Sequence, residues 1–210
     1  LVHHLYPLLY SLALLLYAPL YLARRLAGKE QPVPILVRAG RLPRKLLELP
    51  PKSASRVWIH AVSVGEANSI RMLVQQMALP SDRLYISTTT QTGQSVAKRL
   101  FAKQATVFFF PLDWRTSCRR YLKAVDPDLV ILTETELWPS FIECVKENGT
   151  PLLLINGRFS DRSFERYRRI GFLTRSMLGA FCKLGMQSSE DRERAIQLGG
   201  SSDRIHRVGN

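Results

Sequence analysis

The stretch Val57-Trp58-Ile59-His60-Ala61-Val62-Ser63-Val64-Gly65-Glu66 decides the fold. An apolar run rich in β-branched residues leads into Ser63, Gly65 and a carboxylate, and a helix-like segment at 67–79 follows. This order is typical of a buried parallel strand, a tight turn and a helix start. Ligands of open α/β sheets gather beyond the carboxyl ends of strands, near helix N-termini. Glu66 is therefore a candidate acid or base, although a carboxylate there also complements the helix dipole.

Downstream of this stretch, short apolar runs alternate with helix-like segments. We expect strands at 57–62, 84–88, 106–110, 129–132, 152–155 and 183–187. We expect helices at 67–79, 93–103, 114–124, 139–147, 162–178 and 190–198. Continuous apolar strands between helices predict an α/β fold with a doubly wound parallel sheet.

Length, charge and cysteine content limit the class of protein. The 210 residues suffice for one large α/β domain with a full core. Lysine and arginine number 30 against 17 acids, a formal charge of +13 that favours a polyanionic partner such as nucleic acid, a phosphorylated substrate or an anionic lipid surface. The three cysteines are far apart and form no ligand cluster with histidine, so we expect no metal site, a reducing compartment, and cysteines that act as small core residues.

The amino-terminal segment predicts membrane attachment. Residues 1–23 contain no acid, lysine or arginine, and Arg24, Arg25 and Lys29 follow. About twenty apolar residues suffice to span a bilayer, and a flanking basic cluster favours the cytoplasmic side. We interpret residues 1–27 as a membrane-anchor helix, with a span and an in-plane helix both open. Residues 28–55 are a basic, proline-punctuated linker with one short helix between Pro43 and Pro50, and residues 56–210 form the α/β domain.

Polar residues follow each predicted strand, so we expect a site along one edge of the sheet. In the second of these turns, Thr90, Thr92 and Gly93 could offer hydroxyls and helix-start amides to a phosphate, or they could simply cap a helix. The turn contains no P-loop motif, and the first strand is followed by no dinucleotide fingerprint.

Two carboxylates and a set of arginines complete the candidate site. Glu134 and Glu136 lie two apart after a strand, so in extended geometry they point the same way and could share a proton, hold a cation or fix loops through Arg158. Arg158, Arg162, Arg166 and Arg169 recur at helical spacing, which gives one basic helix face if the helix begins early enough, and this face either binds phosphate or is merely solvated. Nucleic acid is disfavoured because no interleaved aromatic platform accompanies the charge.

Together these motifs resemble the amino-terminal domain of the Kdo transferases, which add 3-deoxy-D-manno-oct-2-ulosonic acid (Kdo) to lipid A precursors. The apolar amino terminus and the basic linker are also similar to that family. The matching segments run in order along nearly the whole chain and are residues 60–66, 88–93, 111–113, 134–139, 156–158, 160, 162–163, 187–188 and 209–210.

The resemblance implies the Rossmann-like, amino-terminal half of a GT-B glycosyltransferase, preceded by an apolar membrane-anchor helix. We therefore expect a fragment of a longer protein whose absent carboxy-terminal domain holds most of the CMP-Kdo donor. The expected acceptor is a lipid A precursor at the cytoplasmic face of the inner membrane, and no metal or other cofactor is expected.

The resemblance also assigns roles to residues. Glu66 would be the general base and Glu134 would stabilise the transition state. Substrate binding would involve Ser63, Gly65, Thr90, Thr92, Gly93, Glu136, Asn156, Arg158 and Arg162. Two alternatives remain open: a non-catalytic, membrane-bound phospholipid-binding or scaffold domain of the same fold, and a relative that uses another nucleotide sugar.

Overall fold

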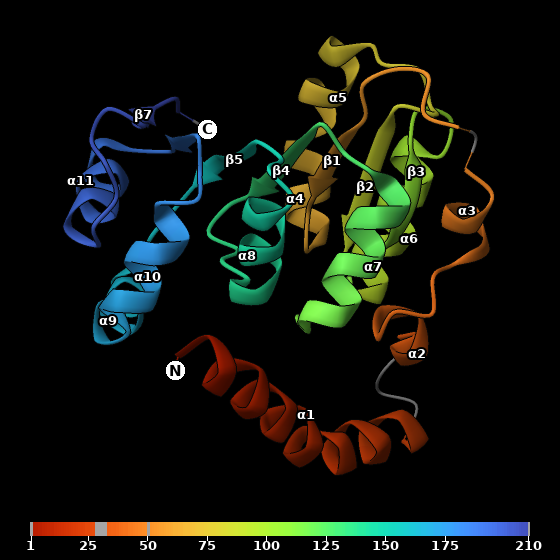
Figure 1. Cartoon of the computed structure of the whole chain (residues 1–210), viewed down its shortest axis with the longest axis horizontal. Helices are drawn as coiled ribbons and strands as arrows, with labels where there is room; N and C mark the ends of the chain where they lie inside the picture. Colours follow the sequence, from red (N-terminus) through yellow and green to blue (C-terminus); the bar gives the residue numbers. More distant parts are fainter. Residues whose placement is uncertain (1, 28–32, 50, 210) are drawn as a thin grey trace.

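Seven strands form one parallel sheet in the order β3-β2-β1-β4-β5-β6-β7, as the computed structural model of residues 2–27, 33–49 and 51–209 describes it (Figure 1). The strands are β1 (Val57–His60), β2 (Leu84–Thr88), β3 (Thr106–Phe109), β4 (Leu129–Thr133), β5 (Leu152–Gly157), β6 (Lys183–Met186) and β7 (Ile205–Arg207). The predicted doubly wound parallel sheet is confirmed. The short edge strand β7 is not among the predicted strands, because Ile205 is its single apolar residue.

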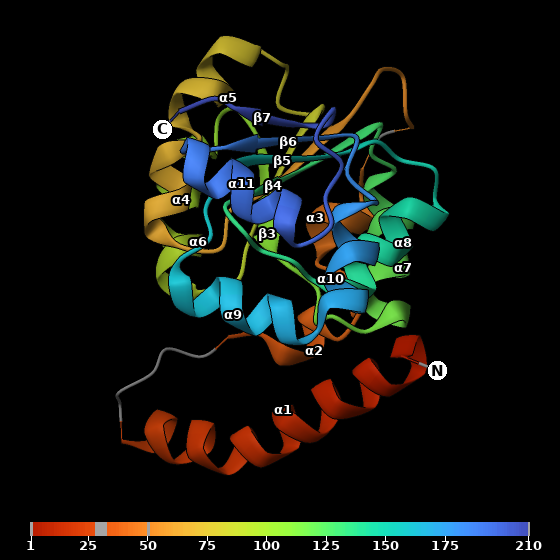
Figure 2. The ribbon, with the colours of Figure 1, turned by 90° about the vertical axis from the view of Figure 1, so that its left-hand side faces the viewer.

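Helices cover both faces of this sheet (Figures 1 and 2). They are α4 (Val64–Ser69), α5 (Arg71–Met77), α6 (Gln91–Phe101), α7 (Arg115–Val125), α8 (Pro139–Glu147), α9 (Asp161–Arg169), α10 (Gly171–Leu178) and α11 (Ser189–Gln197).

Two predicted helices are each divided by an isoleucine. Ile70 separates α4 from α5, and Ile170 separates α9 from α10. Ile170 has a ψ of 37°, outside the helical range. At the break, the Tyr167 carbonyl accepts a hydrogen bond from the Thr174 hydroxyl at 2.8 Å, so this backbone group keeps a partner. Hydrophobic periodicity continues through such a break, so the sequence pattern does not reveal it.

Alternation along the strands divides the core between the two faces of the sheet. Trp58 and Ile59 are both fully buried, yet they belong to different apolar clusters because neighbouring strand residues point to opposite faces. Trp58 packs edge-on against Phe141 with ring centroids 5.1 Å apart. Cys118 and Cys144 are buried as expected, but Cys182 is exposed, so its interpretation as a core residue is wrong.

Helix α1 (Val2–Leu26) lies across one end of the sheet layer (Figures 1 and 2). The short helices α2 (Ile35–Arg38) and α3 (Arg44–Leu47) follow, and α3 packs against α7. Helix α3 confirms the short helix predicted between Pro43 and Pro50. Lys29, linker residues 28–32 and 50, and Asn210 of the last matching segment lie outside the described residues, as do the side chains of Arg24 and Arg25.

Helix α1 is attached to the loop that follows β3. The Asp113 amide donates to the Tyr10 hydroxyl at 3.5 Å, and the Trp114 indole N–H donates to Ser11 Oγ at 3.0 Å. Asp113 itself is fully buried and accepts hydrogen bonds from the first amides of α8, at 2.7 Å in the case of Phe141. Helix α1 therefore rests on a rigid loop at the carboxyl edge of the sheet.

Candidate active site

The strand order reverses between β1 and β4, because the chain moves outward from β1 to β3 and then returns to the other side of β1. In open α/β sheets the crevice at such a switch point is the usual ligand site. Glu66 lies in the helix that follows β1, and Glu134 directly follows β4. Both predicted catalytic carboxylates therefore belong to the two strand ends at the switch point.

Glu66 is held in a polar environment although its side chain is only 3% exposed. Ser63 caps α4: its Oγ accepts from the Glu66 amide at 3.4 Å and donates to Glu66 Oε1 at 3.0 Å. The Val62 amide donates to Glu66 Oε2 at 2.9 Å. These contacts form a capping box in which the carboxylate reaches Val62 instead of the cap residue. Gly65 is exposed in the same turn.

A further contact to Glu66 lies outside the capping box. The hydroxyl of Thr133, at the end of β4, is 2.6 Å from Glu66 Oε2. Three donors thus surround the carboxylate, so its two oxygens lie in a polar environment and not an apolar one.

The threonine-rich turn packs against the Glu66 turn. Thr90 caps α6 by accepting from the Gly93 amide at 3.0 Å, which bears out the capping interpretation for this residue. Its hydroxyl also lies 3.2 Å from the Val62 carbonyl. Thr90 and Thr92 are exposed and line a cavity of about 940 Å³, whose other wall includes Leu14 of α1.

The loop after β4 brings Glu134 and Glu136 near Glu66, but not in extended geometry. Glu134 has a left-handed backbone with a φ of 53°, so the prediction that both side chains point the same way from an extended chain is wrong. Its amide donates to the Ile155 carbonyl at 2.9 Å, which continues the sheet pairing for one more residue.

The three carboxylates influence one another electrostatically. Burial and the negative charge of Glu66 raise the pKa of Glu134, and Arg158 opposes this shift. Burial and the charges of Glu66 and Glu134 raise the pKa of Glu136 to about 7, and Arg166 opposes this shift. The region therefore contains a group that titrates near neutral pH, as acid–base sites often do.

Glu136 and Arg166 share a second cavity. It measures about 760 Å³ and is lined from the domain by Glu136, Trp138, Arg166 and Arg169, and from α1 by Leu5 and Tyr6. The two cavities are lined by different parts of α1, one by residues 5–9 and the other by residues 11–21.

Asn156 and the arginines lie at the end of β5 and beyond it. Asn156 has a φ of 56°, and its carbonyl accepts from the Gln187 side chain at 3.3 Å. Arg158 precedes α9, which begins at Asp161, so the helix does not begin early enough for Arg158 to join the basic helix face. Arg162, Arg166 and Arg169 do lie on α9 and are exposed.

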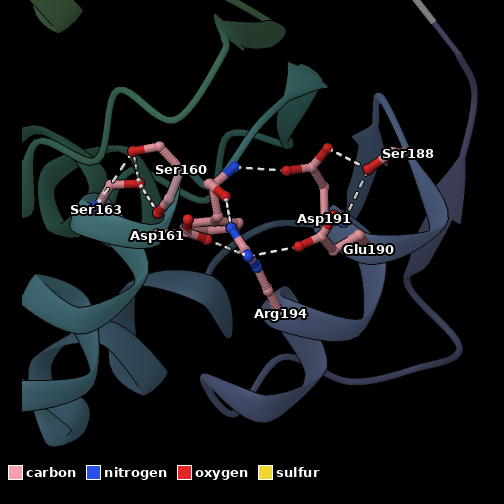
Figure 3. A network of polar contacts seen from close by, with 8 residues as sticks. Ser160, Asp161, Ser163, Ser188, Glu190, Asp191 and Arg194 are labelled. Atoms are coloured by element: carbon pink, nitrogen blue, oxygen red, sulfur yellow. Dashed lines mark hydrogen bonds and ion pairs between the residues drawn. The ribbon is translucent and has the colours of Figure 1, made fainter.

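A polar network fixes the start of α9, the helix that carries Arg162, Arg166 and Arg169 (Figure 3). The guanidinium of Arg194, on α11, pairs with Asp161 and Glu190. Asp191 accepts from the Phe159 amide at 2.7 Å and from the Ser188 hydroxyl at 2.5 Å. Arg162 thus projects from a helix start that is anchored to its neighbour.

Sequence reasoning missed Thr133, and it gave no role to the neighbouring His60. Thr133 has one visible signal, a hydroxyl side chain at the end of an apolar strand and next to Glu134. His60 is fully buried and stacks on Phe110 with ring centroids 3.8 Å apart. Burial lowers its pKa to about 3, so it is neutral and structural. Among the described side chains, no three His, Cys, Asp or Glu residues are grouped to hold a metal ion.

Known proteins resemble this chain in sequence and in fold. Residues 35–210 match the family described as 3-deoxy-D-manno-octulosonic-acid transferase (kdotransferase). The chain is 34% identical to a bifunctional glycosyltransferase/methyltransferase of Fusobacterium nucleatum subsp. nucleatum, over 98% of this chain and 31% of that protein. It is 30% identical to a 3-deoxy-D-manno-octulosonic acid transferase of Bordetella pertussis, over 92% of this chain and 47% of that protein.

A relative of the same name from Chlamydia trachomatis serovar D is 33% identical over 73% of this chain and 36% of its own length. The chain thus spans between 31% and 47% of the length of these relatives. Among solved structures, UDP-GlcNAc 2-epimerase from Neisseria meningitidis shares the fold with a TM-score of 0.52 at 10% identity, over 74% of this chain and 46% of that one. Its similarity supports the Rossmann-like fold of a GT-B half. Since the family match covers most of the residues, and curated relatives of that name are about 30% identical over most of the chain, the chain belongs to the 3-deoxy-D-manno-octulosonic-acid transferase family.

Proposed function

We propose that this chain is the acceptor-binding half of a glycosyltransferase that moves Kdo from CMP-Kdo to a lipid A precursor. The observation that supports this most is the position of Glu66, a carboxylate held by three donors at the switch point of the sheet. A sugar hydroxyl is a poor nucleophile until a positioned carboxylate draws its proton. Glu66 supplies such a carboxylate.

The reaction follows from these positions. The acceptor hydroxyl attacks the anomeric carbon of Kdo, its proton passes to Glu66, and the bond to CMP breaks with CMP as the leaving group. Glu66 Oε1 accepts one described side-chain hydrogen bond, from Ser63, and so keeps a lone pair for the incoming proton. The carboxylate of Glu134 stabilises positive charge that develops on the sugar ring. Most contacts to CMP-Kdo come from the part of the protein beyond this chain.

The acceptor approaches along the carboxyl edge. Thr90, Thr92 and Gly93 follow β2 on one side of β1, and Glu136, Asn156 and Arg158 belong to the ends of β4 and β5 on the other side. Arg162 and Arg166 bind the acceptor phosphates, because guanidinium groups suit bidentate phosphate contacts. The exposed side chains of Ile170 and Phe172, at 44% and 72%, adjoin these arginines.

The division into an anchor at 1–27, a linker at 28–55 and a domain at 56–210 belongs to the same proposal. Residues 5–23 of α1 are long and apolar enough to cross a membrane by length and composition. The helix instead lies in the membrane plane, because Tyr10 and Ser11 hold its middle to Asp113 and Trp114 of the domain, and the Tyr21 hydroxyl accepts from the Val33 amide of the linker at 3.0 Å. The opposite face exposes leucines to lipid at the cytoplasmic side of the inner membrane.

Replacing Glu66 in the full-length enzyme tests this function. Glu66→Gln keeps the side-chain shape and should lower Kdo transfer by roughly 10²–10⁴-fold, the usual contribution of a general base. Glu193→Gln, which removes the same charge at an exposed position, is the control and should transfer normally. Transfer by Glu66→Gln near the wild-type rate would remove the residue from the base role.

The alternative is a non-catalytic phospholipid-binding domain. It is favoured by the capping box, since two of the three contacts to Glu66 have a structural explanation. A full-length protein that binds anionic vesicles but transfers no sugar from CMP-Kdo would support this alternative. Transfer from a different nucleotide sugar would instead show that the protein is a glycosyltransferase with another donor.

A further inference from the structure

Thr133 forms the contact to Glu66 that helix capping does not explain. It is the last residue of β4 and its side chain is fully buried. Its hydroxyl oxygen lies 2.6 Å from Glu66 Oε2 and 2.9 Å from the His60 carbonyl oxygen. The contact therefore joins the two strands on either side of the switch point.

A threonine hydroxyl carries one hydrogen, so it can donate to only one of these two oxygens at a time. While Glu66 is ionised, the carboxylate is the stronger acceptor, and a charge-assisted hydrogen bond forms. Once Glu66 has taken a proton on Oε1, its Oε2 becomes a weaker, neutral acceptor, and the hydroxyl can turn toward the His60 carbonyl. The buried hydroxyl keeps a partner in both states.

The two ends of the carboxylate therefore differ. Oε2 is occupied by the Val62 amide and by Thr133, whereas Oε1 receives the Ser63 hydroxyl alone among the described contacts. We propose that Thr133 is a positioning residue that pins Oε2 of Glu66 and thereby presents Oε1 as the atom that takes the proton. Thr133 keeps its own proton throughout; the transferred proton moves from the acceptor hydroxyl to Oε1. This inference rests on the proposed role of Glu66 as base.

The charged groups around Glu66 set the background for a test. The charge of Glu66 raises the pKa values of Glu134 and Glu136, which lie in the loop after β4. Arg158 opposes the shift of Glu134, and Arg166 opposes that of Glu136. His60, on β1, is neutral. Replacing Thr133 leaves each of these charged side chains in the sequence, so the comparison of Thr133→Val with Thr133→Ser isolates the contribution of the hydroxyl.

The test compares Thr133→Val, which keeps the branched shape, with Thr133→Ser, which keeps the hydroxyl, in the full-length protein. Thr88→Val is the matched control, because Thr88 is also the last, fully buried residue of a strand, yet its hydroxyl binds Gln94. The Glu66 carboxyl is titrated by carbon-13 NMR, with signals assigned through glutamine variants. This readout does not depend on sugar transfer.

We expect the Glu66 carboxyl signal of Thr133→Val to titrate at a higher pH than that of the wild type, because a hydrogen bond to the charged form is lost. The acidic limb of the pH profile of kcat should move in the same direction. The value of kcat should fall about tenfold with little change in KM. Thr133→Ser should restore both values, and Thr88→Val should leave the Glu66 titration unchanged.

An unchanged Glu66 titration in Thr133→Val, or a failure of Thr133→Ser to restore it, would overturn the inference. If Thr133→Val does not fold, Thr133→Ala replaces it in the same comparison. A different result would contradict the proposed function, namely normal transfer by Glu66→Gln. The effect of Thr133 on the Glu66 titration could still be measured in that case.

Discussion

The backbone of Gly93 lies so close to Val62 that a Cβ on Gly93 would stand 2.9 Å from the Val62 carbonyl oxygen. The same Cβ would lie 2.8 Å from Thr90 Oγ1. The carbonyl belongs to backbone at the end of β1 and cannot yield without moving the Glu66 turn. Gly93→Ala should therefore lower the free energy of unfolding by about 1–3 kcal/mol, the usual cost of overpacking. Urea denaturation followed by circular dichroism measures this change.

Gly171→Ala is the control for that substitution. Gly171 is also in the first turn of a helix, but no atom lies within 4 Å of the Cβ it would gain. Alanine favours a helix over glycine by up to about 1 kcal/mol, so this variant should be as stable as the wild type or slightly more stable. Equal stability of the two variants would show that the contact between the turns is not tight.

Glu134 keeps a left-handed backbone that glycine would adopt more easily. A non-glycine residue in this region costs about 1–2 kcal/mol. Glu134→Gly and Glu134→Ala both remove the carboxylate, and Glu134→Gly should be the more stable of the two by about 1 kcal/mol in thermal unfolding. Both should lose transfer in the full-length enzyme. That combination would show that the strained residue is kept for its side chain.

The neighbouring Glu136 serves as the comparison, because it is not among the residues with a positive φ. There the order should reverse, with Glu136→Ala more stable than Glu136→Gly, since glycine loses more backbone entropy on folding. If glycine stabilises both positions equally, the effect at Glu134 does not come from its backbone angle.

The sequence predicts the sheet well because continuous apolar strands that alternate with helices are compatible with few folds other than a parallel sheet between layers of helices. It also predicts that Glu66 and Glu134 meet at one edge, which follows from parallel strand direction alone. It does not reveal the left-handed turn at Glu134, because no glycine or asparagine marks the position. It also does not reveal that Thr133 contacts Glu66, since that contact depends on β4 pairing with β1, a non-local choice. The sequence does not reveal whether Arg158 joins the basic helix face, because helix boundaries are the least certain feature of a periodic pattern.

The titration of Glu136 should make folding stability depend on pH. Its pKa is raised from 4.5 to about 7, so the native state binds a proton more tightly than the unfolded chain. Stability from this group is therefore present below pH 4.5 and is lost as the pH rises through about 7. Glu136→Gln should flatten the curve in this window and raise the free energy of unfolding at pH 8 by about 2 kcal/mol. Urea midpoints at pH 5 and pH 8 measure both effects.

Glu165→Gln provides the control, because Glu165 forms an exposed pair with Arg168 and should change stability by less than about 1 kcal/mol at either pH. A Glu136→Gln variant that follows the wild-type pH dependence would mean that the carboxyl of Glu136 is solvated in the native protein and titrates normally.

The exposed leucines of α1 should determine binding to lipid. Residues 6, 10, 11 and 14 of α1 are partly buried, and Tyr10 and Ser11 contact the domain, whereas Leu12 and Leu16 are 54% and 73% exposed on the other side. Leu12→Asp with Leu16→Asp adds charge to that outer face without touching the docked one. Binding to vesicles that contain anionic phospholipid should weaken at least about tenfold, because apolar burial and attraction to the surface are both reduced.

The matched control places the same charges at the opposite end of the molecule. Gln75 and Gln76 are exposed on α5, which lies far from α1 in both views (Figures 1 and 2). Gln75→Asp with Gln76→Asp lowers the net charge equally and should bind vesicles nearly as well as the wild type. If the two double variants lose binding to the same extent, the attraction comes from net charge alone. The outer face of α1 would then not enter the membrane, because only insertion makes the position of the charges matter.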